Sequence, residues 1–319
     1  MEKRNTKKKN IRVKLIFNPI SGENSESPVQ LMDVIKEMQA WNFTPEPYLI
    51  KPDSVITEVV NEAIDQGILM IVVCGGDGTV SSVARALYGT PVILGIIPLG
   101  TQNNIAFSLG IPTDIPEAIA LLRMGKRFKI DVGMCVCNGI STPLIEICTI
   151  GLFSSLYSAG DDIQHGDITK IGDFLSTLTT TAPSEIQLIL DDDLEIKATG
   201  HLVIVSNMPY IVHHYPFGSD DSLTDGLLDV LFFADLTKME LINYMIQGPG
   251  TGGNENPRIM HYLVKKIIIN TNPQMPIMVD GITLGSGSVQ LEAKRKALTV
   301  ITPKIIPNMI AKRGDLNEK

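Results

Sequence analysis

The sequence predicts a three-layer α/β domain with a parallel sheet, followed by an all-β sandwich domain. Up to about residue 128, short apolar runs alternate with segments of helical spacing. This pattern is typical of a parallel sheet covered by helices on both faces. After residue 128, short β-rich runs are separated by Gly, Pro, Asn or Asp, which indicates a sandwich or barrel. We expect the domains at 11–128, which residues 304–319 could complete, and at 129–303.

In the first domain, the strands are predicted from short and mainly apolar runs. These runs occupy 12–18, 47–51, 68–74 and 91–98. Apolar residues that recur every three or four positions predict the helices. These helices are expected at 28–41, 54–67, 79–89, 103–110 and 114–125. Ligands of such sheets bind at the carboxyl ends of the strands, so the turns after the strands are the first place to look for function.

In the second domain, the predicted strands are short and are bounded by turn residues. They occupy 128–137, 185–192, 194–207, 227–233, 264–270, 276–281, 288–293 and 297–303. Helical spacing interrupts them near 168–180 and at 236–248. The three aspartates 191–193 are expected to form a solvated hairpin turn.

Composition excludes several classes of protein. The chain has 319 residues and a net charge of −8, which argues against a nucleic-acid partner, because such partners require a broad positive surface. No apolar run reaches the roughly 18 to 20 residues that a transmembrane helix needs, and no signal peptide is visible. We therefore expect a cytoplasmic protein. Its four cysteines, Cys74, Cys135, Cys137 and Cys148, are expected in the core, with a metal or redox pair at 135 and 137 as the alternative.

The segment GGDGT, residues 75–79, directly follows the apolar run 68–74. Glycines let backbone N–H groups approach a ligand closely, and a strand, a glycine turn and a helix N-terminus together form an anion site. Asp77 would repel a phosphate unless a divalent cation lies between them. The segment therefore indicates either a metal–polyphosphate site or an ordinary strand-to-helix turn with an aspartate N-cap. It lacks the P-loop and dinucleotide-binding patterns.

Two further polar glycine turns follow predicted strands. NPISG occupies 18–22, and PLGTQNN occupies 98–104. Taken alone, the threonine and the two asparagines of PLGTQNN suit a helix N-cap. Three such turns at the ends of three parallel strands are expected to lie along one edge of the sheet.

These three segments, in this order and spacing, resemble the diacylglycerol kinase catalytic-domain family, which includes bacterial soluble lipid kinases and the sphingosine and ceramide kinases. The group is distantly similar to NAD kinases and phosphofructokinases. IDVG (130–133), TIGL (149–152), TDGLLDV (224–230) and VDG (279–281) extend the resemblance to roughly residues 12–303. It implies an α/β domain and a β-sandwich that bind ATP and Mg²⁺ in the cleft between them.

The resemblance also implies roles for individual residues. The nucleotide phosphates would be held by residues of the three turns: Asn18, Gly75, Gly76, Asp77, Gly78, Thr79, Thr101 and Asn104. Asp77 and Asp131 would belong to an acidic network around magnesium and its waters. Asp225, with backbone carbonyls near Ser222 and Leu227, matches a structural magnesium site. Asp280 would lie close to the acceptor hydroxyl and act as the catalytic residue.

The sequence departs from the family pattern at two positions. Asn104 stands where the family often has Asp, and Ile282 stands where the family has a glutamate that is a candidate general base. Isoleucine cannot accept a proton, so Asp280 would carry that role or the reaction would be slowed. General-base assistance contributes roughly 10²- to 10⁴-fold, so its loss need not abolish turnover.

The hypothesis is therefore an ATP- and Mg²⁺-dependent kinase of a lipid hydroxyl, such as that of diacylglycerol, phosphatidylglycerol or a sphingoid base. Such a protein would meet its lipid peripherally, at the inner membrane face, through apolar side chains. A homodimer is an open alternative for its oligomeric state. A nucleotide or lipid sensor that cannot transfer phosphate is the second hypothesis, and a NAD kinase is the third. NPISG and PLGTQNN match the lipid branch and so disfavour the NAD kinase.

Overall fold

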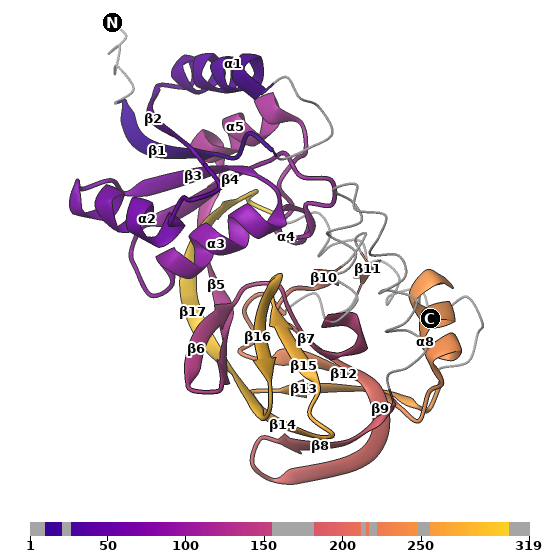
Figure 1. Cartoon of the computed structure of the whole chain (residues 1–319). Coiled ribbons are helices and arrows are strands. Elements are labelled where there is room, and N and C mark those ends of the chain that lie inside the picture. The colour runs from indigo at the N-terminus through magenta and orange to yellow at the C-terminus, as the bar shows by residue number, and fades with distance from the viewer. Residues whose placement is uncertain are drawn as a thin grey trace, which may run out of the picture. The chain divides into compact units, whose positions relative to one another are not determined.

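The computed structural model describes residues 10–20, 27–154, 182–211, 215–216, 222–247 and 256–305. The chain forms two compact units (Figure 1). Unit 1 contains the described residues up to Ile130 and those from Lys296 onward, and unit 2 contains described residues between Asp131 and Arg295. The helix predicted near 168–180, and residues 306–319 of the predicted tail, lie outside the described residues.

Unit 1 is a parallel sheet between two layers of helices, as predicted. The strand order is β17-β4-β3-β1-β2, and each neighbouring pair is parallel. The strands are β1 (Ile11–Phe17), β2 (Phe43–Leu49), β3 (Met70–Gly75), β4 (Ile93–Pro98) and the end of β17 (Val289–Thr302). The helices are α1 (Ser27–Ala40), α2 (Ile56–Asp65), α3 (Asp77–Leu87), α4 (Asn104–Ser108) and α5 (Ile115–Met124). In Figure 1, α1 and α5 lie on one side of the sheet, and α2 and α3 lie on the other.

The core of unit 1 explains why β3 and β4 are apolar throughout. Both strands are buried along their whole length. On one face, Val72 and Cys74 pack in a single cluster with Met38 of α1 and Ile119 of α5. Val60 of α2 is fully buried as well. Because helices cover both faces, the carboxyl ends of the strands are the part of the sheet left for polar turns.

Unit 2 is an antiparallel β-sandwich, which confirms the second part of the fold prediction. Its strands are β5 (Lys126–Cys137), β6 (Ile140–Leu144), β7 (Ile147–Gly151), β8 (Ser184–Leu190), β9 (Leu194–Ser206), β10 (Tyr210–Ile211), β11 (Tyr215–Pro216), β12 (Leu228–Ala234), β13 (Ile259–Val264), β14 (Lys266–Asn272), β15 (Pro276–Val279), β16 (Ile282–Ser286) and the start of β17. The long strand β9 pairs with β8 up to Gly200, and with β7 and β12 beyond it. A Cβ at Gly200 would lie 2.7 Å from the carbonyl oxygen of Phe233, so glycine lets β9 change its pairing partners where β12 approaches closely.

Strands β5 and β17 each contribute residues to both units. The course of β17 differs from the prediction. The runs 288–293 and 297–303 were expected as separate strands, but they form the single strand β17. Residues from Lys296 onward belong to unit 1, and φ at Lys296 is 53°. The polar residues 294–296 lie on a continuous strand because the segments on either side of them are paired, with β14 before them and β4 after them.

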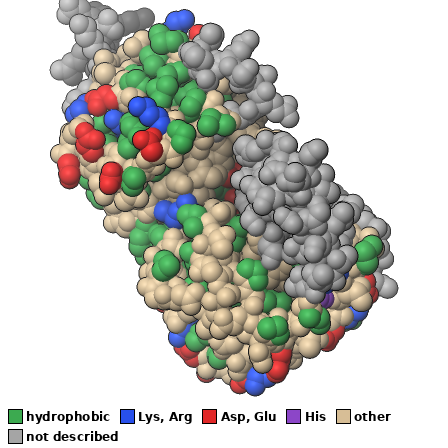
Figure 2. Space-filling model, in the orientation of Figure 1, with side chains coloured by type: hydrophobic (Ala, Val, Ile, Leu, Met, Phe, Trp, Pro, Cys, Tyr) green, Lys and Arg blue, Asp and Glu red, His purple; other side chains and the backbone are tan. Residues whose placement is uncertain are grey.

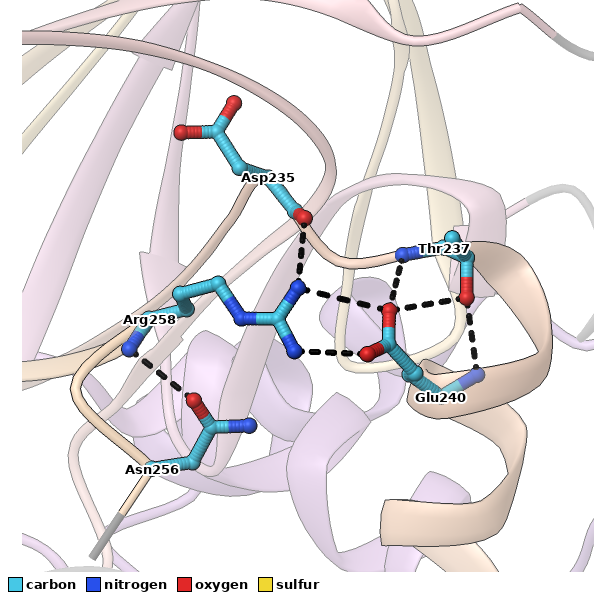
Figure 3. Close-up of polar contacts among 5 residues, drawn as sticks. All are labelled: Asp235, Thr237, Glu240, Asn256 and Arg258. Atoms are coloured by element: carbon cyan, nitrogen blue, oxygen red, sulfur yellow. Dashed lines mark hydrogen bonds and ion pairs between the residues drawn. The ribbon is translucent and has the colours of Figure 1, made fainter.

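Helix α8 (Lys238–Gln247) confirms the helix predicted at 236–248, and a polar network fixes its start (Figure 3). The Glu240 carboxylate accepts hydrogen bonds from the backbone N–H and the hydroxyl of Thr237, each at 2.8 Å. The Thr237 hydroxyl in turn accepts from the Glu240 N–H at 3.3 Å, which is a capping box. Arg258 donates to Glu240 at 2.6 Å and to the Asp235 carbonyl at 3.1 Å. These contacts lower the pKa of Glu240 to about 2.

The four cysteines are free and buried, as the core interpretation predicts. Cys135, Cys137 and Cys148 belong to the central cluster of the sandwich, whereas Val136 between the first two is exposed. Burial raises the pKa of Cys74 and Cys137, and a hydrogen bond with Cys135 together with burial raises that of Cys148. These thiols therefore stay protonated and act as small core side chains.

Asp191–Asp193 form the turn between β8 and β9, as predicted, and all three residues are exposed. The Asp191 carboxylate also accepts the N–H groups of Lys265 and Lys266, each at 2.9 Å. The turn therefore connects β8 to β14 as well as reversing the chain.

On the face of the molecule shown in Figure 2, basic and acidic side chains are interspersed, and apolar side chains are scattered among them.

Candidate active site

The GGDGT segment is the junction between β3 and α3. The strand ends at Gly75, Gly76 is the N-cap of the helix, and Asp77 is its first residue. Gly78 is exposed, and no atom lies within 4 Å of the position that a Cβ would occupy there. The N-terminus of α3 is therefore open at Gly78, and its amides and dipole favour an anion at this point.

The two glycine turns contact each other through their backbones. A Cβ on Gly100 would lie 2.5 Å from the Cα of Gly76, and a Cβ on Gly76 would lie 3.1 Å from the Cα of Gly100. The Leu99 N–H donates to the Gly75 carbonyl at 3.0 Å. Only residues without a side chain allow this approach, so the structure brings GGDGT and PLGTQNN together as one surface.

Asp77 joins the same two turns with its side chain. One carboxylate oxygen accepts the N–H of Asn104, and the other accepts the N–H of Ile105, each at 3.0 Å. These amides lie at the start of α4 and would otherwise lack a helical partner. The negative charge next to the α3 N-terminus is therefore stabilised by a second helix start, and no cation is needed to explain the presence of Asp77.

Asn18 and Thr79 connect the third turn to the first. The Asn18 amide donates to the Thr79 hydroxyl at 2.8 Å, and the Asn18 N–H donates to the Cys74 carbonyl at 3.0 Å. A Cβ at Gly75 would lie 3.0 Å from the Cβ of Thr79, so Gly75 lets Thr79 fold back over the strand end. The ends of β1, β3 and β4 thus meet as predicted, although Ser21 and Gly22 of NPISG lie outside the described residues.

Asn103, one of the N-cap candidates in PLGTQNN, is the N-cap residue of α4, and it also shapes the turn after β4, which the sequence did not indicate. Its backbone is left-handed, with φ 52°. Its side chain accepts the Gly100 N–H at 2.8 Å and donates to the Gly100 carbonyl at 2.6 Å. Asparagine tolerates this backbone conformation better than most residues, which is the signal that could have identified it. Thr101 is exposed, whereas Asn104 is buried.

In unit 2, the predicted metal residues Ser222, Asp225 and Leu227 lie on the loop before β12, whereas Asp131 lies in strand β5. The fully buried Asp131 accepts the Gly226 N–H at 2.7 Å, and Asp225 accepts the N–H of Leu227 at 2.8 Å. The Ser222 hydroxyl donates to Asp229 at 3.0 Å. Asp131, Asp225 and Ser222 therefore hold one loop, while Asp77 belongs to unit 1.

Asp229 and His261 join this loop, and the sequence analysis missed both as site residues. Asp229 is buried, and its second carboxylate oxygen lies 2.8 Å from Nε2 of the partly exposed His261. A histidine on the neighbouring strand β13 carries no sequence signal, because only the register of β12 with β13, in which His261 pairs with Leu231, places it diagonally beside Asp229. Within the described ranges, no three His, Cys, Asp or Glu side chains form a set that could hold a metal.

Asp280 belongs to the turn that joins β15 to β16. Val279 pairs with Ile282, so Asp280 and Gly281 form a two-residue hairpin, and their φ values are 44° and 81°. This is the geometry that an Asp-Gly pair favours. The Asp280 carboxylate accepts the N–H groups of Ile145, Glu146 and Ile147 at 2.9 to 3.0 Å. Asp280, the predicted catalytic residue, thus holds the turn between β6 and β7 in place through these hydrogen bonds.

Ile282 follows this hairpin and is 44% exposed. Asn138 lies in the turn between β5 and β6. Its side-chain amide donates to the carbonyl of Ser286, which belongs to the same strand as Ile282, β16, at 3.0 Å. Val136 and Ile140 on either side of this turn are exposed as well. Val136, Ile140 and Ile282 are therefore exposed apolar side chains on β5, β6 and β16, the three strands that Asn138 connects.

Comparisons with known proteins match both parts of the chain to described protein families. Residues 12–135 match the family described as diacylglycerol kinase catalytic domain, and residues 166–302 match the YegS C-terminal NAD kinase beta sandwich-like domain. A relative in Klebsiella pneumoniae (strain 342), named "Probable lipid kinase YegS-like", is 41% identical over 253 residues, which cover 78% of this chain and 82% of the relative. The diacylglycerol kinase of Staphylococcus carnosus (strain TM300) is 24% identical, with 93% of this chain and 97% of that one covered.

The fold has relatives among solved structures. The crystal structure of a diacylglycerol kinase from Bacillus anthracis str. Sterne superimposes with a TM-score of 0.72 at 24% identity, and the match covers 93% of this chain and 99% of that one. None of the described helices has the length and apolarity required to cross a membrane. The glycine turns, the sandwich and these matches agree, and the chain belongs to the diacylglycerol kinase catalytic-domain family, a family of lipid kinases.

Proposed function

We propose that this chain transfers the γ-phosphate of ATP, with Mg²⁺, to the hydroxyl of a lipid. The observation that carries the proposal is the contact between the two glycine turns of unit 1. Gly76 and Gly100 meet backbone to backbone, and Gly78 leaves the N-terminus of α3 open. A triphosphate needs this kind of close approach to bare amides.

The residues beside this surface fit a magnesium–nucleotide. Magnesium is usually held by one or two carboxylates together with substrate phosphates, so a large acidic cluster is not required. Asp77 would supply the carboxylate, and Thr79, Thr101, Asn18 and the glycine amides would contact the phosphates. When bound, the ion would neutralise charge on the phosphates. Asp77 also keeps α4 in place, so its contribution would combine positioning with electrostatics.

Unit 2 would receive the lipid. The exposed Val136, Ile140 and Ile282 suit peripheral contact with a bilayer surface, at the cytoplasmic face, rather than insertion. Relatives named diacylglycerol kinase favour diacylglycerol over phosphatidylglycerol or a sphingoid base as the acceptor. For the loop around Asp225, we propose a structural magnesium site with carbonyls near Ser222 and Leu227, while Asp131 orients the loop.

The proposal is tested by transfer of labelled γ-phosphate from ATP to a panel of lipids in mixed micelles, with and without Mg²⁺. Gly78→Ala is the sharpest variant, because the added methyl group would point into open space beside the first turn of α3. We expect this variant to be at least as stable as the wild type, because alanine favours a helix over glycine, and to bind ATP more weakly. Wild-type affinity for ATP in Gly78→Ala would contradict phosphate binding at this helix.

A second candidate function is a sensor that binds nucleotide or lipid without transfer. It is favoured by the three amides that occupy the Asp280 carboxylate and by the isoleucine at position 282. ATP binding without transfer to any lipid of the panel would support the sensor. A NAD phosphorylation assay distinguishes the NAD kinase alternative.

A further inference from the structure

The turn between β5 and β6 contains the only Asn-Gly pair of the chain, at residues 138–139. Cys137 pairs with Ile140, so Asn138 and Gly139 form a two-residue hairpin, and their φ values are 50° and 76°. This is the backbone geometry that an Asn-Gly pair favours. Both residues are exposed, and no atom lies within 4 Å of the position that a Cβ on Gly139 would occupy. The pair is therefore open to water.

The Asn138 side chain also connects this turn to another strand. Its amide donates to the Ser286 carbonyl at 3.0 Å and, with longer geometry, to the Leu284 carbonyl at 3.5 Å. Two glycines with positive φ leave room for the amide, because a Cβ on Gly285 would lie 3.4 Å from Asn138 Nδ2 and a Cβ on Gly287 would lie 3.0 Å from Oδ1. The amide thus joins the β5–β6 hairpin to β16.

Asparagine is one of the thermolabile residues of proteins, and the residue that follows it decides how labile it is. The backbone nitrogen of that residue attacks the side-chain carbonyl carbon, and glycine hinders the attack least because it has no side chain. Gly139 lies in the loop, outside the ladder of β5 and β6. The hydrogen bond to Ser286 is solvent-exposed, so water can replace it and the amide can turn toward Gly139.

We propose that Asn138 is a site of spontaneous deamidation, with water as the co-reactant, and that this modification uncouples the β5–β6 hairpin from β16. The Gly139 nitrogen bonds to Asn138 Cγ, its proton passes to the departing amide nitrogen, and ammonia leaves a cyclic succinimide. Water then adds to one of the two ring carbonyl carbons and opens the ring to aspartate or isoaspartate. One water is consumed and one ammonia released, with no oxidation or reduction. The inference is independent of the proposed phosphate transfer.

The product cannot replace the asparagine in its contact with β16. A carboxylate has no proton to donate to the Ser286 carbonyl, and its negative charge would face carbonyl oxygens. Strands β6 and β16 contain no charged side chain, so neither supplies a counter-ion. The neighbouring titratable group on β5, the Cys137 thiol, is buried and its pKa is raised. Deamidation should therefore weaken the connection between the hairpin and β16.

The site is tested by incubating the folded full chain at mildly alkaline pH and following two of its peptides by mass spectrometry. Asn42 is the matched internal control, because it also lies in a turn with a positive φ of 62° but precedes Phe43. We expect aspartate and isoaspartate to accumulate at position 138 while position 42 keeps its amide. A retained amide at position 138, or equal loss at both positions, would overturn the site.

Two variants test the uncoupling. Asn138→Asp should melt below the wild type at neutral pH, and the deficit should shrink as the pH falls through the carboxyl pKa, because a protonated carboxyl group can donate again. Asn138→Gly keeps the backbone geometry but has neither donor nor charge, so its deficit should stay constant over the same pH range. Melting of Asn138→Asp at the wild-type temperature, or a deficit that does not change with pH, would overturn the proposed effect of the charge.

Discussion

Two of the three Asp-Gly pairs in the chain, at 77–78 and 280–281, have carboxylates that perform similar tasks in different surroundings. Asp77 in unit 1 binds two amides at the start of α4, and Asp280 in unit 2 binds three amides of the turn at 145–147. Asp77 is the first residue of a helix, whereas Asp280 has a positive φ of 44° in a hairpin. Beside Asp77 lies an open helix N-terminus, and beside Asp280 lies the buried Glu146. What each turn can do therefore depends more on the residues around its carboxylate than on the Asp-Gly sequence itself.

The largest effect in this comparison is expected for Asp280→Ala. Three amides lose their acceptor, and each such hydrogen bond contributes roughly 1 kcal/mol, so the free energy of unfolding should fall by about 3 kcal/mol. Asp280→Asn keeps one oxygen and tolerates a positive φ, and it should lose less. Urea denaturation monitored by circular dichroism measures both. Equal stability of Asp280→Ala and the wild type would show that these amides find other partners.

Gly100→Ala should follow. The new Cβ would lie 2.5 Å from the Cα of Gly76 and 2.9 Å from Asn103 Oδ1, so the turns must move apart. Overpacking of this kind costs about 1 to 3 kcal/mol, and ATP binding should weaken along with stability. Gly78→Ala is the paired variant, in which stability should stay constant or rise while ATP binding weakens. Calorimetric titration with ATP and a thermal melt of each protein separate the two effects.

Asp77→Ala should be milder in stability than Asp280→Ala, because two amides are released instead of three. The loss of a helix-capping side chain costs roughly 0.5 to 2 kcal/mol. Asp77→Asn retains one acceptor and should recover part of this stability, but it should not recover phosphate transfer if the carboxylate charge organises magnesium. Transfer at the wild-type rate by Asp77→Asn would limit Asp77 to its structural role. Initial rates at several Mg²⁺ concentrations distinguish the two cases.

The smallest effect concerns the polar network at α8, which is solvent-exposed. The pKa of Glu240 is lowered to about 2 from its usual value of 4.5, chiefly by its hydrogen bond with Arg258. A lowered pKa in the folded state means that the stabilisation is present above pH 4.5 and is lost as the pH falls toward 2. Glu240→Gln should therefore melt below the wild type at neutral pH, and the difference should shrink between pH 4.5 and 2. A difference in melting temperature that stays constant from pH 4.5 to pH 2 would mean that the negative charge of Glu240 does not contribute to stability.

Much of the fold could be predicted because its signals are local. The fully apolar 68–74 indicated a strand buried on both faces, and the helical spacing of 28–41 indicated α1, which runs from Ser27 to Ala40. Strand β17 was divided in the prediction because the polar residues 294–296 interrupt its apolar pattern. Pairing with β14 and β4 holds these residues in one strand, and pairing between distant strands is invisible to a local pattern.

The sequence by itself determined the order of the domains, the glycine turns at the ends of β1, β3 and β4, and the family to which these motifs belong. Local spacing and backbone freedom are sufficient for these conclusions. The tertiary structure alone decided what each carboxylate holds. Asp77 reaches amides 27 and 28 residues away, and Asp280 reaches amides 133 to 135 residues away. Because backbone N–H groups are present at every position except proline, sequence cannot show which of them a carboxylate will meet. Only the folded chain brings Asn138 to the carbonyl group of Ser286.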